Sequence, residues 1–319
     1  MVRLLASVAL LGFVLPAQAE TWDMPMAYAD GNYHTQNGKL FAEAVTLCTG
    51  GALEIVVHGG GSLYGGGEIK RAVQTGQAPI GERLLSAHQN ESPIFGVDSV
   101  PFLATSFEAS DKLAAAARPA IEEVLAEQNL KLLYSVPWPP QGLYFAKPIE
   151  GVGDMAGTKF RAYNAATARL AELAEMQPVQ IEAAELSQAL ATGVAEAFIS
   201  SGSTGYDRKV WEQMTHFYDT QAWLPRNYVF VNLQAYEAAS DRVKGCLDSA
   251  ALLAQVAGTT RARELTDFYL SQLAANGMTV TGPSEALKAD LAGIGETMAT
   301  EWQEVAGEAG ASILEAFAK

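Results

Sequence analysis

The sequence has few of the side chains that bind metal ions. It contains only four histidines and two cysteines among 319 residues. The histidines are scattered along the chain, and no Cys/His cluster has the spacing of a zinc site; they are His34, His58, His88 and His216. The sequence therefore predicts no metal site and no cofactor.

Basic residues are also scarce. The chain has 21 Lys and Arg against 36 Asp and Glu, which gives a formal net charge of −15. Such an acidic balance argues against nucleic acid or an anionic membrane surface as a partner. It is compatible with an anionic small molecule, because one arginine in a dry cleft outweighs distant, screened surface charge.

Long hydrophobic runs are absent after the N-terminus. The one run, Leu4 to Leu15, is too short to span a membrane. Arg3 precedes it and the A-x-A sequence Ala17-Gln18-Ala19 follows, as in a secretory signal peptide. We therefore expect residues 1–19 to be removed, the protein to be exported to a bacterial periplasm, and no stable membrane insertion. In that oxidising compartment Cys48 and Cys246 are compatible with a disulfide or with two buried thiols.

Complete catalytic motifs are also missing. His58-Gly59-Gly60-Gly61 copies the oxyanion-hole motif of α/β-hydrolases, but that fold also needs a G-x-S-x-G elbow. No such elbow follows, and Gly202-Ser203-Thr204-Gly205 has the wrong spacing. The glycine-rich loop lacks the G-K-[ST] ending of a phosphate loop. A binding protein without catalysis is therefore favoured over an exported hydrolase.

Apolar strands alternate with helices along most of the chain, which predicts an α/β fold with a doubly wound sheet. About 300 mature residues are typical of two lobes with a cleft between them. Residues 247–276 are helix-forming over about 45 Å, long enough to bridge both lobes, and Pro283-Ser284 starts a last helix. We predict lobe I from 20–142 plus 230–257, and lobe II from 143–229 plus 258–319.

Residues 157–205 have a strand-helix-helix-strand pattern. Arg161 ends the first strand, and the hydroxyl residues Ser200, Ser201 and Thr204 end or follow the last one. Ligands of open α/β sheets bind at the carboxyl ends of strands, and the arginine fork matches a carboxylate. We therefore interpret Arg161 as a ligand clamp, the alternative being an ordinary surface arginine or salt bridge.

Aromatic residues accompany this arginine. Trp138 is fixed between Pro137 and Pro139, and Trp223 lies in a loop just before a predicted strand. Each aromatic alone is more often a core residue, but rigid aromatics beside an arginine suit a ring that carries a carboxylate. The set is Tyr33, Trp138, Tyr144, Tyr163, Trp223 and Tyr228.

Ordered short strings over nearly the whole mature chain resemble the DctP-type substrate-binding proteins of tripartite ATP-independent periplasmic (TRAP) transporters. They include Thr49 to Ile55, Ala72 to Gly76, Pro101 to Leu103, Asp154 to Arg161, and Ala189 to Gly193. The resemblance implies a two-lobe receptor that closes on an organic acid and delivers it to TRAP membrane permease subunits. It also implies that Arg161 pairs with the ligand carboxylate and that Asn164 lies nearby.

One departure from that family affects the predicted site. Where the family usually reads V-D-G after the Thr-Gly pair, this chain has Val194-Ala195-Glu196-Ala197. Ser200, Ser201 and Thr204 are therefore our candidates for the contacts made after this strand. The lobes are expected to open and close about strand crossings near 142–146 and 227–232.

The ligand class is the least constrained prediction. A C4 dicarboxylate needs two cations, with Arg226 a candidate second, and a sugar acid needs polar groups such as Asn227. A 2-oxo acid is a further alternative. The aromatic set favours an aromatic or bulky apolar monocarboxylate, since burying such faces against a polar ligand wastes hydrophobic contact. Glu82 is expected either to accept a ligand hydroxyl or, slightly favoured, to pair with Arg83 or Arg71.

Overall fold

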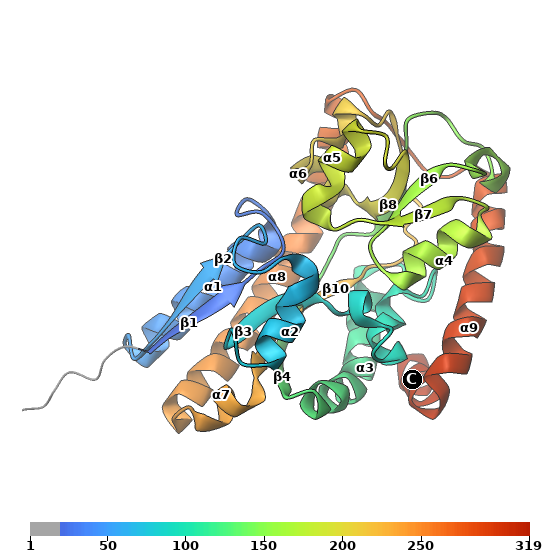
Figure 1. Ribbon diagram of the computed structural model, residues 1–319. Helices are drawn as coiled ribbons and strands as arrows, with labels where there is room; N and C mark the ends of the chain where they lie inside the picture. The colour runs from blue at the N-terminus through green and yellow to red at the C-terminus, as the bar shows by residue number, and fades with distance from the viewer. Residues whose placement is uncertain (1–19) are drawn as a thin grey trace, which may run out of the picture.

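The computed structural model describes residues 20–319. The predicted signal peptide, residues 1–19, lies outside the described residues. The described chain folds into two α/β lobes joined by two crossing segments and two long helices (Figure 1). No helix within residues 20–319 is long and apolar enough to cross a membrane.

Lobe I is built on β10, which pairs antiparallel with β3 on one side and β4 on the other. A parallel pair, β1 and β2, lies beside β3. The elements are β1 (Glu20–Pro25), α1 (Tyr33–Thr49), β2 (Leu53–His58), α2 (Ile69–Gln74), β3 (Ile80–Leu84), α3 (Phe107–Glu127), β4 (Leu130–Pro137), β10 (Arg226–Asn232) and α7 (Leu233–Ala238). Short 3-10 turns at Gly66–Glu68, Leu85–His88 and Pro93–Ser99 complete the lobe.

Lobe II contains one six-stranded sheet in the order β11-β9-β5-β8-β6-β7. Its parallel strands β8, β6 and β7 end at the same edge, facing lobe I. The elements are β5 (Gln141–Phe145), β6 (Lys159–Ala162), α4 (Ala165–Leu173), β7 (Gln177–Gln180), α5 (Leu186–Ala191), β8 (Ala197–Ser201), α6 (Gly202–Asp207), β9 (His216–Tyr218) and β11 (Thr279–Thr281). The 3-10 turns are Val152–Met155, Ala183–Glu185 and Val210–Glu212.

Two extended segments cross between the lobes and hydrogen-bond to each other. The backbone N–H of Trp138 donates to the carbonyl of Pro225 at 2.8 Å, and that of Gln141 donates to the carbonyl of Trp223 at 2.9 Å. The N–H of Ala222 donates back to the carbonyl of Gln141 at 3.0 Å. The crossings thus lie just outside the predicted 142–146 and 227–232, because residues 142–145 belong to β5 and residues 227–232 to β10.

Two long helices also connect the lobes. Helix α8 (Asp241–Ala275) packs on α1 and β4 of lobe I and on α6 and β11 of lobe II. Helix α9 (Glu285–Ala318) runs from lobe II to α3 of lobe I, with one non-helical residue at Gly307 (Figure 1). Serine side chains at Ser240 and Ser284 accept N–H bonds at their starts and cap both helices. The predicted bridging helix is confirmed, and it begins six residues before Leu247.

The first half of α8 is held against lobe I at two places. Cys48 at the end of α1 and Cys246 form a disulfide with a Cα–Cα distance of 5.6 Å, which decides between the two thiol states that the sequence left open. Further along, a Cβ at Gly258 would lie 2.6 Å from a methyl of Val136 on β4. Only a glycine therefore lets the helix approach the sheet this closely.

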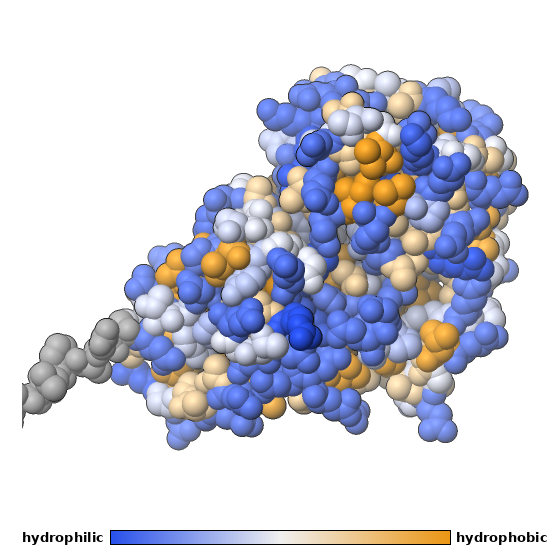
Figure 2. Space-filling model, viewed as in Figure 1, coloured by the Kyte–Doolittle hydropathy of each residue, from blue (hydrophilic) through white to orange (hydrophobic). Residues whose placement is uncertain are grey.

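The strand-helix-helix-strand prediction for residues 157–205 missed β7. This strand contains Pro178 and is largely exposed, so it has neither the apolar alternation nor the β-branched composition of a typical strand. It forms through parallel pairing with β6 at the edge of the sheet, where proline is tolerated. Charged and polar residues dominate the molecular face in Figure 2, in keeping with the acidic composition.

Candidate ligand-binding site

A cavity of about 40 Å³ lies between the lobes and receives side chains from both. Lobe I contributes residues from the end of β3 and the loop after β1, and lobe II contributes the carboxyl ends of β6, β7 and β8. The lining residues are Tyr28, Arg83, Leu84, Trp138, Gln141, Arg161, Tyr163, Glu182, Ala183, Ser200, Thr204 and Pro225. This is the sheet edge at which open α/β proteins bind ligands.

Arg161 lines this cavity although only 3 % of its surface is exposed. Its Nε donates to the carbonyl of Ile181 at 2.9 Å, and its guanidinium carbon lies 5.1 Å from the centre of the Tyr163 ring. Within residues 20–319 its terminal nitrogens Nη1 and Nη2 donate to no protein acceptor, so they are available to a ligand. Burial lowers the pKa of Arg161 to about 10, and it therefore stays charged at neutral pH.

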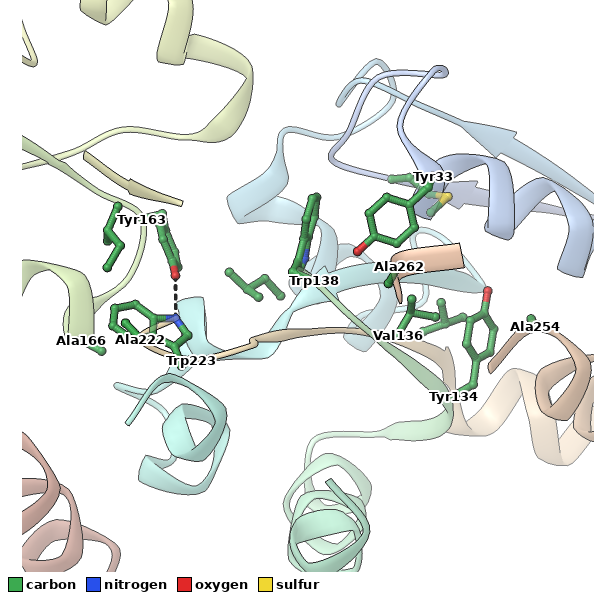
Figure 3. Close-up of a cluster of buried hydrophobic side chains, with 14 of the residues drawn as sticks. Tyr33, Tyr134, Val136, Trp138, Tyr163, Ala166, Ala222, Trp223, Ala254 and Ala262 are labelled. Carbon is green, nitrogen blue, oxygen red and sulfur yellow. Dashed lines mark hydrogen bonds between the residues drawn. The ribbon is translucent and has the colours of Figure 1, made fainter. Parts of the chain in front are cut away.

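Tyr163 is fixed from two sides beneath this arginine. Its hydroxyl donates to Oε1 of Gln141 at 3.2 Å and accepts from Nε1 of Trp223 at 3.0 Å (Figure 3). Burial raises the pKa of Tyr163 well above its usual value, so the phenol is neutral. Trp223 therefore lies behind Tyr163 and positions it, and it does not line the cavity.

Trp138 forms the lobe I side of the cavity. Its Nε1 donates to Oδ1 of Asn227 at 2.8 Å, and the amide of Asn227 donates to Oε1 of Glu82 at 2.8 Å. The indole also packs edge-on against Tyr28, with ring centres 4.7 Å apart. Glu82 and Asn227 thus position Trp138, which lines the cavity, and do not line it themselves.

Glu82 is almost completely buried, and its predicted pairing with Arg83 or Arg71 does not occur. Burial raises the pKa of Glu82 to about 8, more than the bond from Asn227 lowers it. His34 Nδ1 lies 3.7 Å from the other carboxyl oxygen. Burial also lowers the pKa of His34, so at neutral pH this contact joins two uncharged groups and is not an ion pair.

Arg83 forms a salt bridge across the cleft. Its Nη1 and Nη2 donate to the two carboxylate oxygens of Glu182 in lobe II, at 3.2 and 2.8 Å. A Cβ at Gly66 would lie 2.7 Å from Nη1 of Arg83 and 2.8 Å from Oε2 of Glu182. The glycine loop therefore passes directly over this pair.

The structure brings five of the eleven predicted ligand-binding residues to the cavity: Trp138, Arg161, Tyr163, Ser200 and Thr204. The other six pack around it. They are Tyr33, Glu82, Asn164, Ser201, Trp223 and Asn227. Tyr33 donates to the carbonyl of Pro137 at 2.6 Å, and Ser201 caps α6. All eleven stay predictions as regards ligand contact.

Asn164 is engaged in holding the lobes together. Its Oδ1 accepts from the N–H of Thr167 and caps α4, while its Nδ2 donates to the hydroxyls of Ser86 and Ser99 in lobe I at 3.0 and 3.3 Å. Because its hydrogen-bonding groups are used in this way, the amide sits outside the cavity lining.

Arg226 does not supply the second cation expected for a dicarboxylate. Its side chain points between α3 and β4, where it bonds to Ser110, Asp111 and Ser135. The second cation in the lining is Arg83.

Sequence reasoning missed several lining residues, above all Tyr28, Gln141, Glu182 and the cavity role of Arg83. Tyr28 follows the carboxyl end of β1, so the strand-end rule could have found it; Gln141 begins β5, so that rule does not reach it. Glu182 carried no signal, because it follows the strand that was missed and its partner is 99 residues away.

Two alternative sites fit less well. A larger groove of about 520 Å³ between α4 and α9 contains Arg169, but this arginine forms a bidentate pair with Glu301. In the string that resembles an oxyanion hole, the N–H groups of Gly60 and Gly61 donate to the carbonyls of Tyr28 and Met26. Among residues 20–319 no group of three or more His, Cys, Asp and Glu side chains is placed to hold a metal ion.

Comparison with known proteins identifies similar chains over nearly the whole length. The family model described as bacterial extracellular solute-binding protein, family 7 (DctP), matches residues 26–308. A marine-metagenome TRAP solute-binding protein specific for pyroglutamate, solved with co-purified pyroglutamate, is 54 % identical, with a TM-score of 0.94 over 94 % of this chain and 99 % of that one.

Two solved structures from Bordetella pertussis are also similar. DctP6, an extracytoplasmic solute receptor binding pyroglutamic acid, is 45 % identical, with a TM-score of 0.92 over 93 % of this chain and 99 % of its own. DctP7, described in the same terms, is 40 % identical, with a TM-score of 0.93 over 94 % and 100 %. The expected two-lobe binding-protein fold is confirmed.

Proposed function

This chain belongs to the DctP family, family 7 of the bacterial extracellular solute-binding proteins, and we propose that it is a periplasmic receptor for pyroglutamate. In this proposal the signal peptide 1–19 directs export, the cleft captures the acid, and the loaded receptor delivers it to a TRAP-type membrane permease. The observation that carries the proposal is the free guanidinium edge of Arg161 in an interlobe cavity, in a chain 54 % identical to a pyroglutamate-specific protein.

Pyroglutamate suits the chemistry of this cavity. It is a small flat lactam ring with one carboxylate, one N–H donor and one carbonyl acceptor. Arg161 would take the carboxylate with two parallel hydrogen bonds, and Trp138 and Tyr163 would cover the ring. Gln141, Ser200 and Thr204 line the same cavity and offer polar groups for the lactam edge.

This ligand differs from the aromatic or bulky apolar monocarboxylate that the sequence favoured, a preference that is not confirmed. Trp223 was expected to enclose the ring, but its indole N–H is bonded to Tyr163 and it lies behind the lining. With one tryptophan fewer in the lining, and with Gln141, Ser200 and Thr204 there, we favour a polar lactam ring over a benzoate-like one. C4 dicarboxylates, 2-oxo acids and sugar acids are the competing ligands.

Capture is proposed to work by closure of the lobes. Ligand groups that touch both lobes stabilise the closed form and shift the population towards it. The residues that would move least relative to each other are those of the two hydrogen-bonded crossing segments around Trp138 and Trp223. A receptor of this kind returns its ligand unchanged, whereas a hydrolase would not.

The test is native mass spectrometry of the freshly purified protein followed by calorimetry with pyroglutamate, benzoate, malate, 2-oxoglutarate and gluconate. We expect pyroglutamate to bind most tightly and to be recovered intact. Tighter binding of any other acid in the panel would overturn the ligand, and turnover of the bound acid would overturn the receptor class.

A further inference from the structure

Three side chains that are charged at neutral pH line the cavity: Arg83, Arg161 and Glu182. Glu182 binds Arg83 through both carboxylate oxygens. Arg161 has no such carboxylate partner within residues 20–319. The positive charge of Arg83 is therefore compensated inside the site, and that of Arg161 is available to a ligand.

Several other ionisable groups at or beside the cavity are uncharged at neutral pH. Burial raises the pKa of Tyr28 to about 12 and that of Glu82 to about 8. Tyr163 is likewise a neutral phenol. Arg208 lies outside the lining, although its charge acts on Arg161. The lining itself thus carries two positive charges and one negative charge, a net charge of one.

We propose that Glu182 is a specificity-determining residue that restricts this cavity to ligands with a single negative charge. This inference rests on the proposed function, because it takes the cavity around Arg161 as the ligand site. Arg161 clamps one carboxylate, and Glu182 occupies Arg83, so that a second carboxylate finds no free cation and meets the negative charge of Glu182.

The backbone fixes Glu182 in this role. Its neighbour Ile181 accepts the Nε–H of Arg161 at 2.9 Å, and the N–H of Ile181 donates to the carbonyl of Ala162 at 3.0 Å. Glu182 is thereby fixed beside the strand that carries Arg161, and it reaches the opposite lobe to meet Arg83. Arg83 and Arg161 line the same cavity, so one ligand can reach both. Whether Arg83 is paired with Glu182 therefore decides whether a ligand held by Arg161 can place a second carboxylate.

A glycine loop lies against the ion pair of Arg83 and Glu182. A Cβ at Gly66 would lie 2.7 Å from Nη1 of Arg83 and 2.8 Å from Oε2 of Glu182, so a side chain there would displace the ends of both, and a Cβ at Gly67 would lie 3.5 Å from Oε1 of Glu182. The loop backbone can therefore lie directly on the ion pair. Although the Glu182 side chain keeps 37 % of its surface exposed, the Arg83 side chain keeps only 5 %, so its charge needs a nearby partner.

The experiment compares two acids with the same five-carbon skeleton but different charge, pyroglutamate (one negative charge) and glutarate (two). Calorimetry gives the ratio of their dissociation constants for the parent and for Glu182→Gln. We expect the parent to prefer pyroglutamate, and Glu182→Gln to shift the ratio at least tenfold towards glutarate, since Arg83 is then free to bind a second carboxylate.

Two further variants separate charge from shape. Arg83→Gln combined with Glu182→Gln restores a net charge of one, and we expect it to return the ratio towards the parent value. Glu185→Gln removes an equivalent negative charge from an exposed position three residues away, and we expect it to leave the ratio unchanged. Melting temperatures of all variants check that each is folded.

The inference is overturned if Glu182→Gln keeps the parent's ratio within threefold, or if Glu185→Gln shifts it equally. Failure of the proposed ligand looks different, because the parent itself would then prefer another acid. If that acid is a monocarboxylate, the same ratio is measured with its dicarboxylate homologue. A parent that prefers the dicarboxylate overturns the inference outright.

Discussion

Nε1 of Trp138 donates a hydrogen bond to Oδ1 of Asn227 at 2.8 Å, and this bond ties the aromatic wall of the cavity to the central strand of lobe I. The amide nitrogen of Asn227 donates a second hydrogen bond, to Glu82. Both bonds are buried, so the asparagine satisfies two polar groups that would otherwise have no partner.

Asn227→Ala is expected to lower the free energy of unfolding by about 1–3 kcal/mol, because it leaves the Trp138 N–H and the Glu82 carboxyl buried without their hydrogen-bond partner. It should also weaken pyroglutamate binding by releasing the indole. Urea unfolding and calorimetry measure the two effects. In the background Trp138→Phe, which has no N–H, the same substitution should cost less; equal costs in both backgrounds would contradict the coupling.

Glu82 predicts a pH dependence of stability. Its pKa is about 8 in the folded protein against an ordinary value of 4.5, so between these values the folded state binds a proton that the unfolded state has lost. Stability therefore falls as pH rises from about 4.5 to 8, by at most about 1.4 kcal/mol per pH unit from this group. His34 acts in the opposite direction only below its unfolded value of 6.5.

Glu82→Gln should flatten this fall, since glutamine does not titrate. Urea unfolding at pH 5, 6, 7 and 8 measures the slope for parent and variant. Parallel curves for the two proteins above pH 6.5, where His34 no longer contributes, would show that Glu82 is not protonated in the folded state.

Arg161→Ala is expected to weaken ligand binding by about 2–5 kcal/mol, because it removes the cation that faces the ligand carboxylate. Arg161→Lys keeps the charge but loses the planar fork, so its affinity should lie between those of the parent and the alanine variant. Calorimetry measures both. Arg169→Lys on α4 is the matched control, and parent-like binding by Arg161→Ala would refute the central assignment.

The disulfide should contribute to stability and not to binding. Replacing both Cys48 and Cys246 by alanine is expected to lower the free energy of unfolding by about 2–4 kcal/mol, because the bond closes a long loop in the unfolded chain. Neither cysteine lines the cavity, so the calorimetric affinity should not change. A variant with parent-like stability would contradict this account.

Closure should be visible in solution. Saturating pyroglutamate is expected to reduce the radius of gyration measured by small-angle scattering, because the two lobes move towards each other. Scattering curves that superimpose with and without ligand would refute the proposed motion.

The sequence predicted the elements whose own residues encode them. Apolar periodicity located α1, a continuous apolar run located β10, and the helix-forming run from Leu247 revealed α8, because each pattern is contained in the segment itself. The strand β7 was not predicted, since its polar residues become a strand only by pairing with β6. The residues of β7 alone show neither the alternation nor the composition that predicts a strand.

The same distinction applies to the site. Arg161 was predicted because a strand end is a local feature with a known place in the fold. The pairing of Arg83 with Glu182 was not, because it depends on how the two lobes meet. Trp223 was predicted to line the cavity because it lies in a loop just before a strand; its bond to Tyr163, which holds it behind the lining, is visible only in three dimensions.

The tight contact between Gly258 and Val136 gives α8 a fulcrum. The helix is fixed to lobe I from the disulfide to this point, and the arm from Gly258 to Ala275 extends about 25 Å towards lobe II. A tilt of about 10° at the fulcrum would move the tip of that arm by about 4 Å. Any side chain larger than glycine at position 258 would push the helix away from the sheet. The point about which α8 tilts would then move, and so would its end in lobe II.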